Sequence, residues 1–130
     1  MGGRGTYASG IKAKQTYKQV AIIGGVKVLV PIDDEASLKL PEESHSSKAY
    51  ILLDSNGKFK QYREYNKDHK VILDIDYHIE PKFDKRKKIL HVHEYPEPGI
   101  ENRKFSKSRL LTNEELKWFR RFFKGGYNER

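Results

Sequence analysis

Strict alternation of apolar and polar residues predicts β-strands, each with one buried face, at residues 73–78 and 89–95. Successive side chains of a strand point to opposite faces, so the polar residues of each segment share a face. If the two strands pair antiparallel and bury their apolar residues together, their polar residues gather on one side of a sheet. That side would carry Asp74, Asp76, His78, His91 and His93.

Glycine-containing turns predict two further strand pairs. Two β-branched runs within residues 17–31 flank Gly24 and Gly25, and a two-residue primed turn needs positive φ at both of its central positions. Pro31 then ends the second run, because proline cannot donate to a strand ladder. Residues 48–53 and 58–65 form the second pair, joined by a turn of the Asn-Gly type within residues 54–57.

The remaining segments connect these strands. Residues 33–47 are acidic and serine-rich without a sustained period, which predicts a long loop with a short helix near residues 35–40. A turn at 66–69 precedes the first alternating strand, and a linker at 79–85 contains Pro81. Residues 86–95 return as a strand, and a basic loop follows at 99–108.

The last element is a capped helix. Thr112 fits the N-cap position and Glu115 the third helical position, which together make a capping box. The helix runs to about Lys124 and is ended by two glycines. Its apolar stripe is predicted to be Leu116, Phe119, Phe122 and Phe123. We therefore expect an α+β domain: a twisted antiparallel sheet of about five or six strands with the C-terminal helix packed on it.

Length and composition predict a single domain. The chain has 130 residues, of which 36% are hydrophobic and 34% charged, so its core is small and its surface ionic. We place a flexible basic arm at 1–14, the α+β domain at 15–126 and a tail at 127–130. The absence of cysteine excludes disulfides and thiolate metal sites. No apolar run approaches the roughly 20 residues that span a bilayer, so no membrane partner is expected.

The net charge of +8 is unevenly distributed. Residues 102–130 carry nine bases and three acids, whereas residues 31–81 carry eleven acids and seven bases. Basic termini attract polyanions, so RNA or another polyanion is a candidate partner. The predicted nucleic-acid-binding residues are Arg86, Lys88, Arg103, Lys104 and Arg109.

Three interpretations of the histidine face remain open. In the first, Asp76, His78, His91 and His93 bind a metal ion, since imidazole and carboxylate suit zinc. In the second, no cofactor is needed, and a ribonuclease site uses histidines that titrate near neutral pH. Its predicted catalytic residues are His91, His93, Tyr95 and His78. In the third, the histidines are partly exposed strand residues without a reaction.

Several short motifs carry a resemblance to phage proteins. They are a Gly-Gly-x-Gly arm, the strand at 48–53, the turn at 66–70 and the run His91-Val92-His93-Glu94-Tyr95 before the capped helix. In this order they resemble the C-terminal domain of phage minor head proteins of the Mu F type. They are also similar to prophage toxin nucleases of the barnase, colicin and RelE-like fold. The resemblance spans roughly residues 45–124.

The resemblance implies a phage or prophage origin and a toxin-like ribonuclease domain, with His91, His93 and Tyr95 at the matching positions. It also implies a phage capsid or portal protein as a partner, and a cytoplasmic or virion-associated location. One departure is the basic run at 82–88, which replaces a passage rich in glycine and histidine. A non-catalytic phage structural or interaction domain is therefore the alternative.

Overall fold

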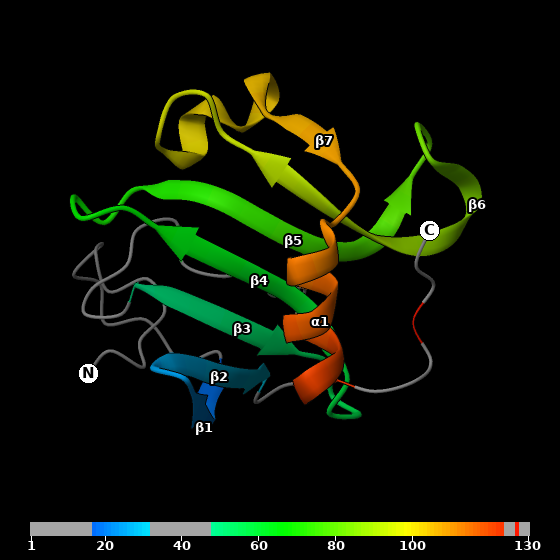
Figure 1. Cartoon of the computed structure of the whole chain (residues 1–130). Helices are drawn as coiled ribbons and strands as arrows, with labels where there is room; N and C mark the ends of the chain where they lie inside the picture. Colours follow the sequence, from blue (N-terminus) through cyan, green and yellow to red (C-terminus); the bar gives the residue numbers. More distant parts are fainter. Residues whose placement is uncertain (1–16, 32–47, 124–126, 128–130) are drawn as a thin grey trace.

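Seven strands follow one another across a single sheet in chain order, and one helix crosses one face of that sheet (Figure 1). The computed structural model describes residues 17–31, 48–123 and 127. The strands are β1 (Tyr17–Ile23), β2 (Val26–Pro31), β3 (Ala49–Leu53), β4 (Phe59–Tyr65), β5 (Val71–Glu80), β6 (Asp84–Glu94) and β7 (Lys107–Arg109). The helices are the 3₁₀ helix η2 (Ile100–Phe105) and the α-helix α1 (Asn113–Phe122). The predicted α+β class is confirmed.

The sheet differs from the prediction in strand number and in one pairing. It has seven strands rather than five or six, because β7 lies where a basic loop was expected. The helix η2 lies in the same expected loop. β2 and β3 pair parallel, so the sheet is mixed rather than purely antiparallel. A parallel pair needs a connection of about a dozen residues or more, and residues 32–47 are long enough to supply it.

The glycine hairpin between β1 and β2 is confirmed. Gly24 and Gly25 have φ angles of 55° and 85°, as a primed two-residue turn requires. The turn between β3 and β4 is also present, but only Gly57 has positive φ there (82°), so it is not a primed Asn-Gly turn. Instead, Oδ1 of Asp54 accepts hydrogen bonds from the backbone N–H groups of Asn56 and Lys58.

The turn between β4 and β5 repeats this design with different residues. Oδ1 of Asn66 accepts hydrogen bonds from the backbone N–H groups of Asp68 and Lys70. His69 takes the place that glycine holds in the other turn, with a φ angle of 69°. It is the one non-glycine residue with positive φ in the described ranges.

β5 and β6 form a long hairpin that replaces the predicted linker at 79–85. β5 continues to Glu80, and β6 already begins at Asp84. The pairing passes from Ile79 with Lys88 to Glu80 with Asp84, so residues 85–87 are extra residues of a bulge in β6. A bulge bends and twists its strand. The end of this hairpin accordingly curls away from the rest of the sheet (Figure 1).

Apolar side chains are buried on both faces of the sheet. The core on the helix side is formed by Val26, Val28, Ala49, Ile51, Phe59, Ile75, Leu90, Val92 and Phe119. A second cluster on the opposite face is formed by Leu29, Tyr50, Leu52, Tyr65, Val71 and Tyr95. The second cluster covers only part of that face, and the polar residues of β4, β5 and β6 occupy the rest.

The capping box of α1 is confirmed, whereas its predicted apolar stripe is wrong at one position. The Thr112 hydroxyl accepts from the backbone N–H of Glu115, whose carboxylate accepts from the backbone N–H of Thr112. The helix ends at Phe122, which is 38% exposed rather than buried in the stripe. Phe123, which is part of the predicted stripe, packs on the core as expected, and Trp118 packs there as well.

The structure describes one residue of the predicted tail, but neither the predicted arm nor the predicted long loop. Tyr127, which was placed in the tail, packs on the helix-side core, and its hydroxyl accepts a 2.7 Å hydrogen bond from the backbone N–H of Phe59. The predicted arm at 1–14 and the predicted loop at 33–47 lie outside the described residues. Among the described residues, no helix is long and apolar enough to cross a membrane.

Candidate metal centre

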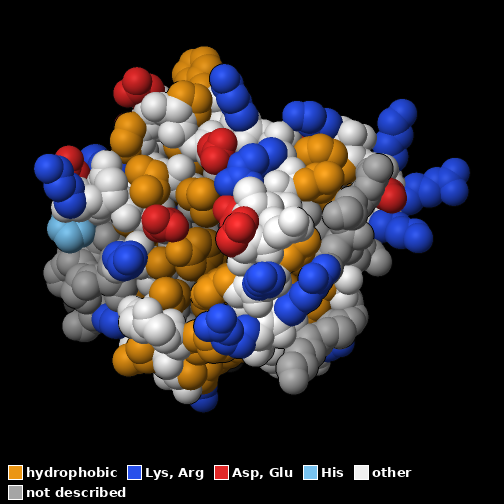
Figure 2. Space-filling view, viewed as in Figure 1, with side chains coloured by type: hydrophobic (Ala, Val, Ile, Leu, Met, Phe, Trp, Pro, Cys, Tyr) orange, Lys and Arg blue, Asp and Glu red, His pale blue; other side chains and the backbone are white. Residues whose placement is uncertain are grey.

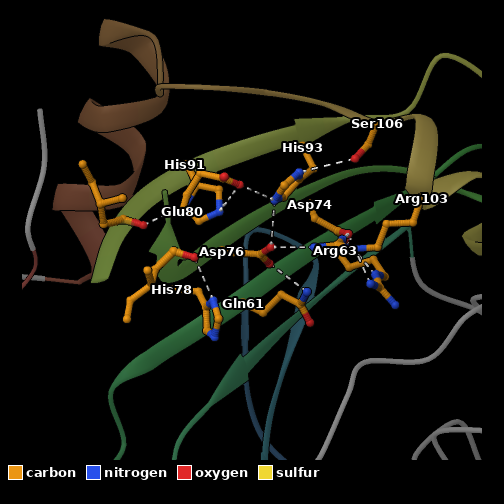
Figure 3. A network of polar contacts seen from close by, with 12 residues as sticks. Gln61, Arg63, Asp74, Asp76, His78, Glu80, His91, His93, Arg103 and Ser106 are labelled. Carbon is orange, nitrogen blue, oxygen red and sulfur yellow. Dashed lines mark hydrogen bonds and ion pairs between the residues drawn. The ribbon is translucent and has the colours of Figure 1, made fainter. Parts of the chain in front are cut away.

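The predicted polar side of the β5–β6 pair exists and lies opposite α1. In the observed register Asp74 pairs with His93, and Asp76 pairs with His91. Their apolar neighbours Ile75 and Val92 belong to the helix-side core, so the carboxylates and imidazoles point away from α1. We call this side of β4, β5 and β6 the polar face (Figure 3).

Three side chains of the polar face are arranged so that they could hold one metal ion. Asp76, His91 and His93 each offer one ligand atom, and these atoms all lie within 4.8 Å of one another. The two imidazole rings meet edge to face, with centroids 5.0 Å apart. Nε2 of His93 lies 3.5 Å from Oδ2 of Asp76. Two imidazoles and one carboxylate are a ligand set used by catalytic zinc sites.

Hydrogen bonds fix the orientation of both rings. Nδ1 of His91 lies 2.8 Å from the carbonyl oxygen of Ile89, which can only accept, so Nδ1 carries the proton and Nε2 is left with its lone pair. Nδ1 of His93 lies 3.4 Å from Oγ of Ser106, so its Nε2 faces Asp76. This division of the ring nitrogens is typical of metal-binding histidines.

Asp76 is also held in place by its neighbours on the polar face. Nε2 of Gln61 donates a 2.8 Å hydrogen bond to Oδ1 of Asp76, and Nη2 of Arg103 donates a 3.0 Å bond to Oδ2. Arg103 comes from η2, which therefore contacts the polar face directly (Figure 3). The carboxylate keeps one orientation because both of its oxygens are bound.

Asp74 forms the centre of an adjoining ionic network. It accepts hydrogen bonds from Arg63 on β4, from the hydroxyl of Tyr95 and from Arg103. Arg103 therefore joins Asp74 to Asp76. This network connects β4, β5 and η2 next to the candidate metal ligands.

Glu80 adds a second carboxylate to the group. Its Oε1 lies 4.0 Å from Nε2 of His91 and 3.9 Å from Nε2 of His93. Phe83, from the same hairpin, lies nearby, with its ring centroid 6.5 Å from that of His91. Glu80 was placed in a linker by the sequence analysis. Continuing the alternation of Asp74, Asp76 and His78 by two more residues would have found it.

The environment shifts the pKa values of two of the predicted catalytic residues. Burial lowers the pKa of His93 below its ordinary value of 6.5, and the positive charge of Arg103 lowers it further. Burial and the carboxylate of Asp74 raise the pKa of Tyr95 to about 12. At neutral pH His93 is therefore an uncharged base, and Tyr95 keeps its proton as a hydrogen-bond donor.

The other predicted site residues occupy different surroundings. His78 is exposed, its Nδ1 lies 3.1 Å from the carbonyl oxygen of Ile79, and it is not part of the three-residue group. Arg109 forms ion pairs with Glu94 and Glu115. Arg86, Lys88 and Lys104 are exposed at the surface.

Two residues of the polar face, Gln61 and Arg63, were not identified from the sequence. They lie on β4, where polar residues occupy both faces, so no apolar alternation distinguishes the side that they take. Their cross-strand partners are Asp76 and Asp74 respectively. The register, which the sequence does not give, brings them to the site.

Compared with known proteins, the chain matches no protein-family description, no curated protein and no solved structure. The resemblance to phage minor head and toxin nuclease domains stays a prediction.

Proposed function

We propose that Asp76, His91 and His93 bind a divalent ion of the zinc type and that this ion makes the polar face a hydrolytic centre. The observation that carries the proposal is the convergence of one ligand atom from each residue within 4.8 Å. With these three residues as its ligands, such an ion would have a coordination position left for a water molecule, whose pKa it would lower. Ligands limited to nitrogen and oxygen are those expected in a chain without cysteine.

Glu80 supports a hydrolytic rather than a purely structural role. Its carboxylate lies on the same side of the group as both Nε2 atoms, at 3.9–4.0 Å. A bound ion of this type would supply an acidic water, and the carboxylate of Glu80 is placed where it could hold a proton for a hydrolytic reaction. Glu80 is thus the candidate general base of the centre.

The alternative of a metal-independent ribonuclease uses the same histidines differently. Both rings would then have to reach a phosphodiester as acid and base. His91 is only 2% exposed, and its Nδ1 is already bound to a backbone carbonyl. Burial of this kind suits a metal ligand better than a group that must touch a large substrate.

The test is the binding of Zn²⁺ to the chelator-treated full chain, measured by isothermal titration calorimetry and elemental analysis. We expect one ion per chain and a loss of affinity of about tenfold or more in His93→Ala and in His91→Ala. His78→Ala is the matched control, since this histidine is exposed and lies outside the group. Circular dichroism verifies that each variant is folded.

Three results would overturn the proposal. The first is the absence of stoichiometric binding, and the second is an equal loss of affinity in the His78 control. The third is cleavage of RNA in EDTA that His93→Ala abolishes, which would establish the metal-independent ribonuclease instead.

A further inference from the structure

Two segments flank His93 and form the rims of the candidate metal centre. We call residues 82–88 the hairpin rim and residues 104–107 the η2 rim. Nε2 of His93 lies 3.9 Å from Oε1 of Glu80, which is next to the hairpin rim, and its Nδ1 lies 3.4 Å from Oγ of Ser106 in the η2 rim. Nζ of Lys82, in the hairpin rim, donates a 3.0 Å hydrogen bond to the carbonyl oxygen of Ser108, the residue that follows the η2 rim. The two rims therefore lie close together.

Both rims carry exposed positive charge. The hairpin rim has a run of four consecutive exposed bases, Lys85, Arg86, Lys87 and Lys88. The one acid of this rim, Asp84, accepts hydrogen bonds at Oδ1 from the backbone N–H groups of Arg86 and Lys87 and thereby shapes the bulge. Lys104 and Lys107 are exposed on the η2 rim. Figure 2 shows Lys and Arg side chains projecting from the edge where Figure 1 places the hairpin end.

Some basic residues near the site form ion pairs within the fold, whereas others are exposed where a ligand could bind. Arg103 binds Asp74 and Asp76, and Arg109 binds Glu94 and Glu115. The exposed side chains of Lys85, Arg86 and Lys87 belong to the bulge at the end of the hairpin. A bulge beside a site is a common means of directing side chains toward it.

Each rim also presents a phenylalanine next to a lysine. Phe105 is 60% exposed, and Nζ of Lys104 lies 5.2 Å from the centre of its ring. Phe83 is partly exposed, with Nζ of Lys82 at 5.4 Å. Positive side chains interleaved with exposed aromatic rings suit single-stranded nucleic acid, because its phosphates bind the cations and its unpaired bases stack on the rings.

We propose that the hairpin rim and the η2 rim together bind single-stranded nucleic acid across the polar face. The substrate class of the metal centre would then be a phosphodiester. This assignment of substrate rests on the proposed function, whereas binding itself does not. All binding experiments below are therefore performed in EDTA, so that a failure of metal binding and a failure of nucleic-acid binding are distinguishable.

The first experiment measures binding of a fluorescein-labelled 20-nucleotide oligouridylate to the full chain by fluorescence anisotropy over a range of salt concentrations. The variant Lys85→Glu/Arg86→Glu/Lys87→Glu should bind at least tenfold more weakly. Loss of three phosphate contacts should make the slope of log K against log salt shallower by about 2. The matched control is the variant Lys58→Glu/Lys60→Glu/Lys67→Glu, which changes the net charge by the same amount at exposed positions on other turns and strands. This control should retain the wild-type slope.

The second experiment tests stacking. Phe105→Ala should weaken oligonucleotide binding by roughly tenfold, as expected for the loss of one stacked base. Phe122→Ala is the matched control, because Phe122 is also exposed and also lies near a cation, Arg121 at 5.9 Å, but on α1. This control should bind as the wild type does.

The proposal is overturned if the hairpin-rim variant and its control lose affinity equally, or if Phe105→Ala binds as tightly as the wild type. It is also overturned if the chain binds phosphatidylserine vesicles but not the oligonucleotide. That result would identify the rims as a membrane-binding surface.

Discussion

The guanidinium of Arg63 donates two hydrogen bonds to the carboxylate of Asp74, at 2.7 Å to Oδ1 and 3.2 Å to Oδ2. The two residues are cross-strand partners on β4 and β5, and Asp74 is completely buried (0% exposed). A buried carboxylate is stable only while its charge is paired and its oxygens are hydrogen-bonded. The pair therefore holds the strand that carries Asp76 to its neighbour.

Removal of this charge should destabilise the protein strongly. Asp74→Asn keeps the size of the side chain but removes the buried negative charge that pairs with Arg63 and Arg103. We expect a loss of about 3–5 kcal/mol in the free energy of unfolding, measured by urea denaturation. Asp68→Asn, in an exposed turn, is the control and should change the stability by less than about 0.5 kcal/mol. Equal effects in the two variants would contradict a structural role for the pair.

The two similar turns predict opposite effects of substitution at equivalent positions. Gly57→Ala places a Cβ atom on a residue with φ of 82° and should cost about 1–2 kcal/mol. His69→Gly relieves the same strain at φ of 69° and should gain about 0.5–1 kcal/mol. Thermal unfolding followed by circular dichroism measures both. A destabilised His69→Gly variant would mean that the imidazole contributes more than the strain costs.

Glu115 should make the stability depend on pH in acid. The hydrogen bond from Arg109 lowers the pKa of Glu115 below its ordinary value of 4.5 in the folded protein. The stability that this interaction contributes is therefore present above about pH 4.5 and is lost as the pH falls through the folded pKa. Glu115→Gln should flatten the stability profile between about pH 5 and pH 3, whereas Glu114→Gln, an exposed neighbour on α1, should not.

If the metal proposal holds, Zn²⁺ should stabilise the folded chain. An ion at about a thousand times its dissociation constant adds about 4 kcal/mol to the free energy of unfolding when it binds the native state alone. The wild type should show this rise in differential scanning calorimetry and lose it on addition of EDTA. His93→Ala should gain at least about 1.4 kcal/mol less than the wild type, since its affinity is expected to be tenfold or more lower, whereas His78→Ala should respond as the wild type does.

The alternating segments made part of the site predictable from the sequence. A period of two places Asp74 and Asp76 on one face of β5, and the same period places His91 and His93 on one face of β6. Burial of the apolar neighbours then leaves only one way to pair these faces. The capping box was equally predictable, because its hydrogen bonds lie within four residues.

The missed features depend on contacts between distant segments. Glu80 continues the alternation of Asp74, Asp76 and His78, but it was expected in a linker because no local pattern predicts the bulge that lets the hairpin extend to Glu80 and Asp84. Arg103 was predicted to bind nucleic acid, since its sequence neighbours are basic, yet it folds onto Asp74 and Asp76. The parallel pairing of β2 with β3 was missed because it spans residues 32–47, and adjacent strands more often pair antiparallel.

The parallel pairing of β2 with β3 also leads us to expect an order in which the strands fold. Strands β3 to β6 are joined by consecutive hairpins, so their contacts can form early and locally. β2 meets β3 through three Cα pairs, and this pairing requires residues 32–47 to close a loop first. We therefore expect the β1–β2 hairpin to dock last in folding and to open first in the native state. Hydrogen exchange should show its amides losing protection while those of β5 and β6, which carry the candidate metal ligands, stay protected.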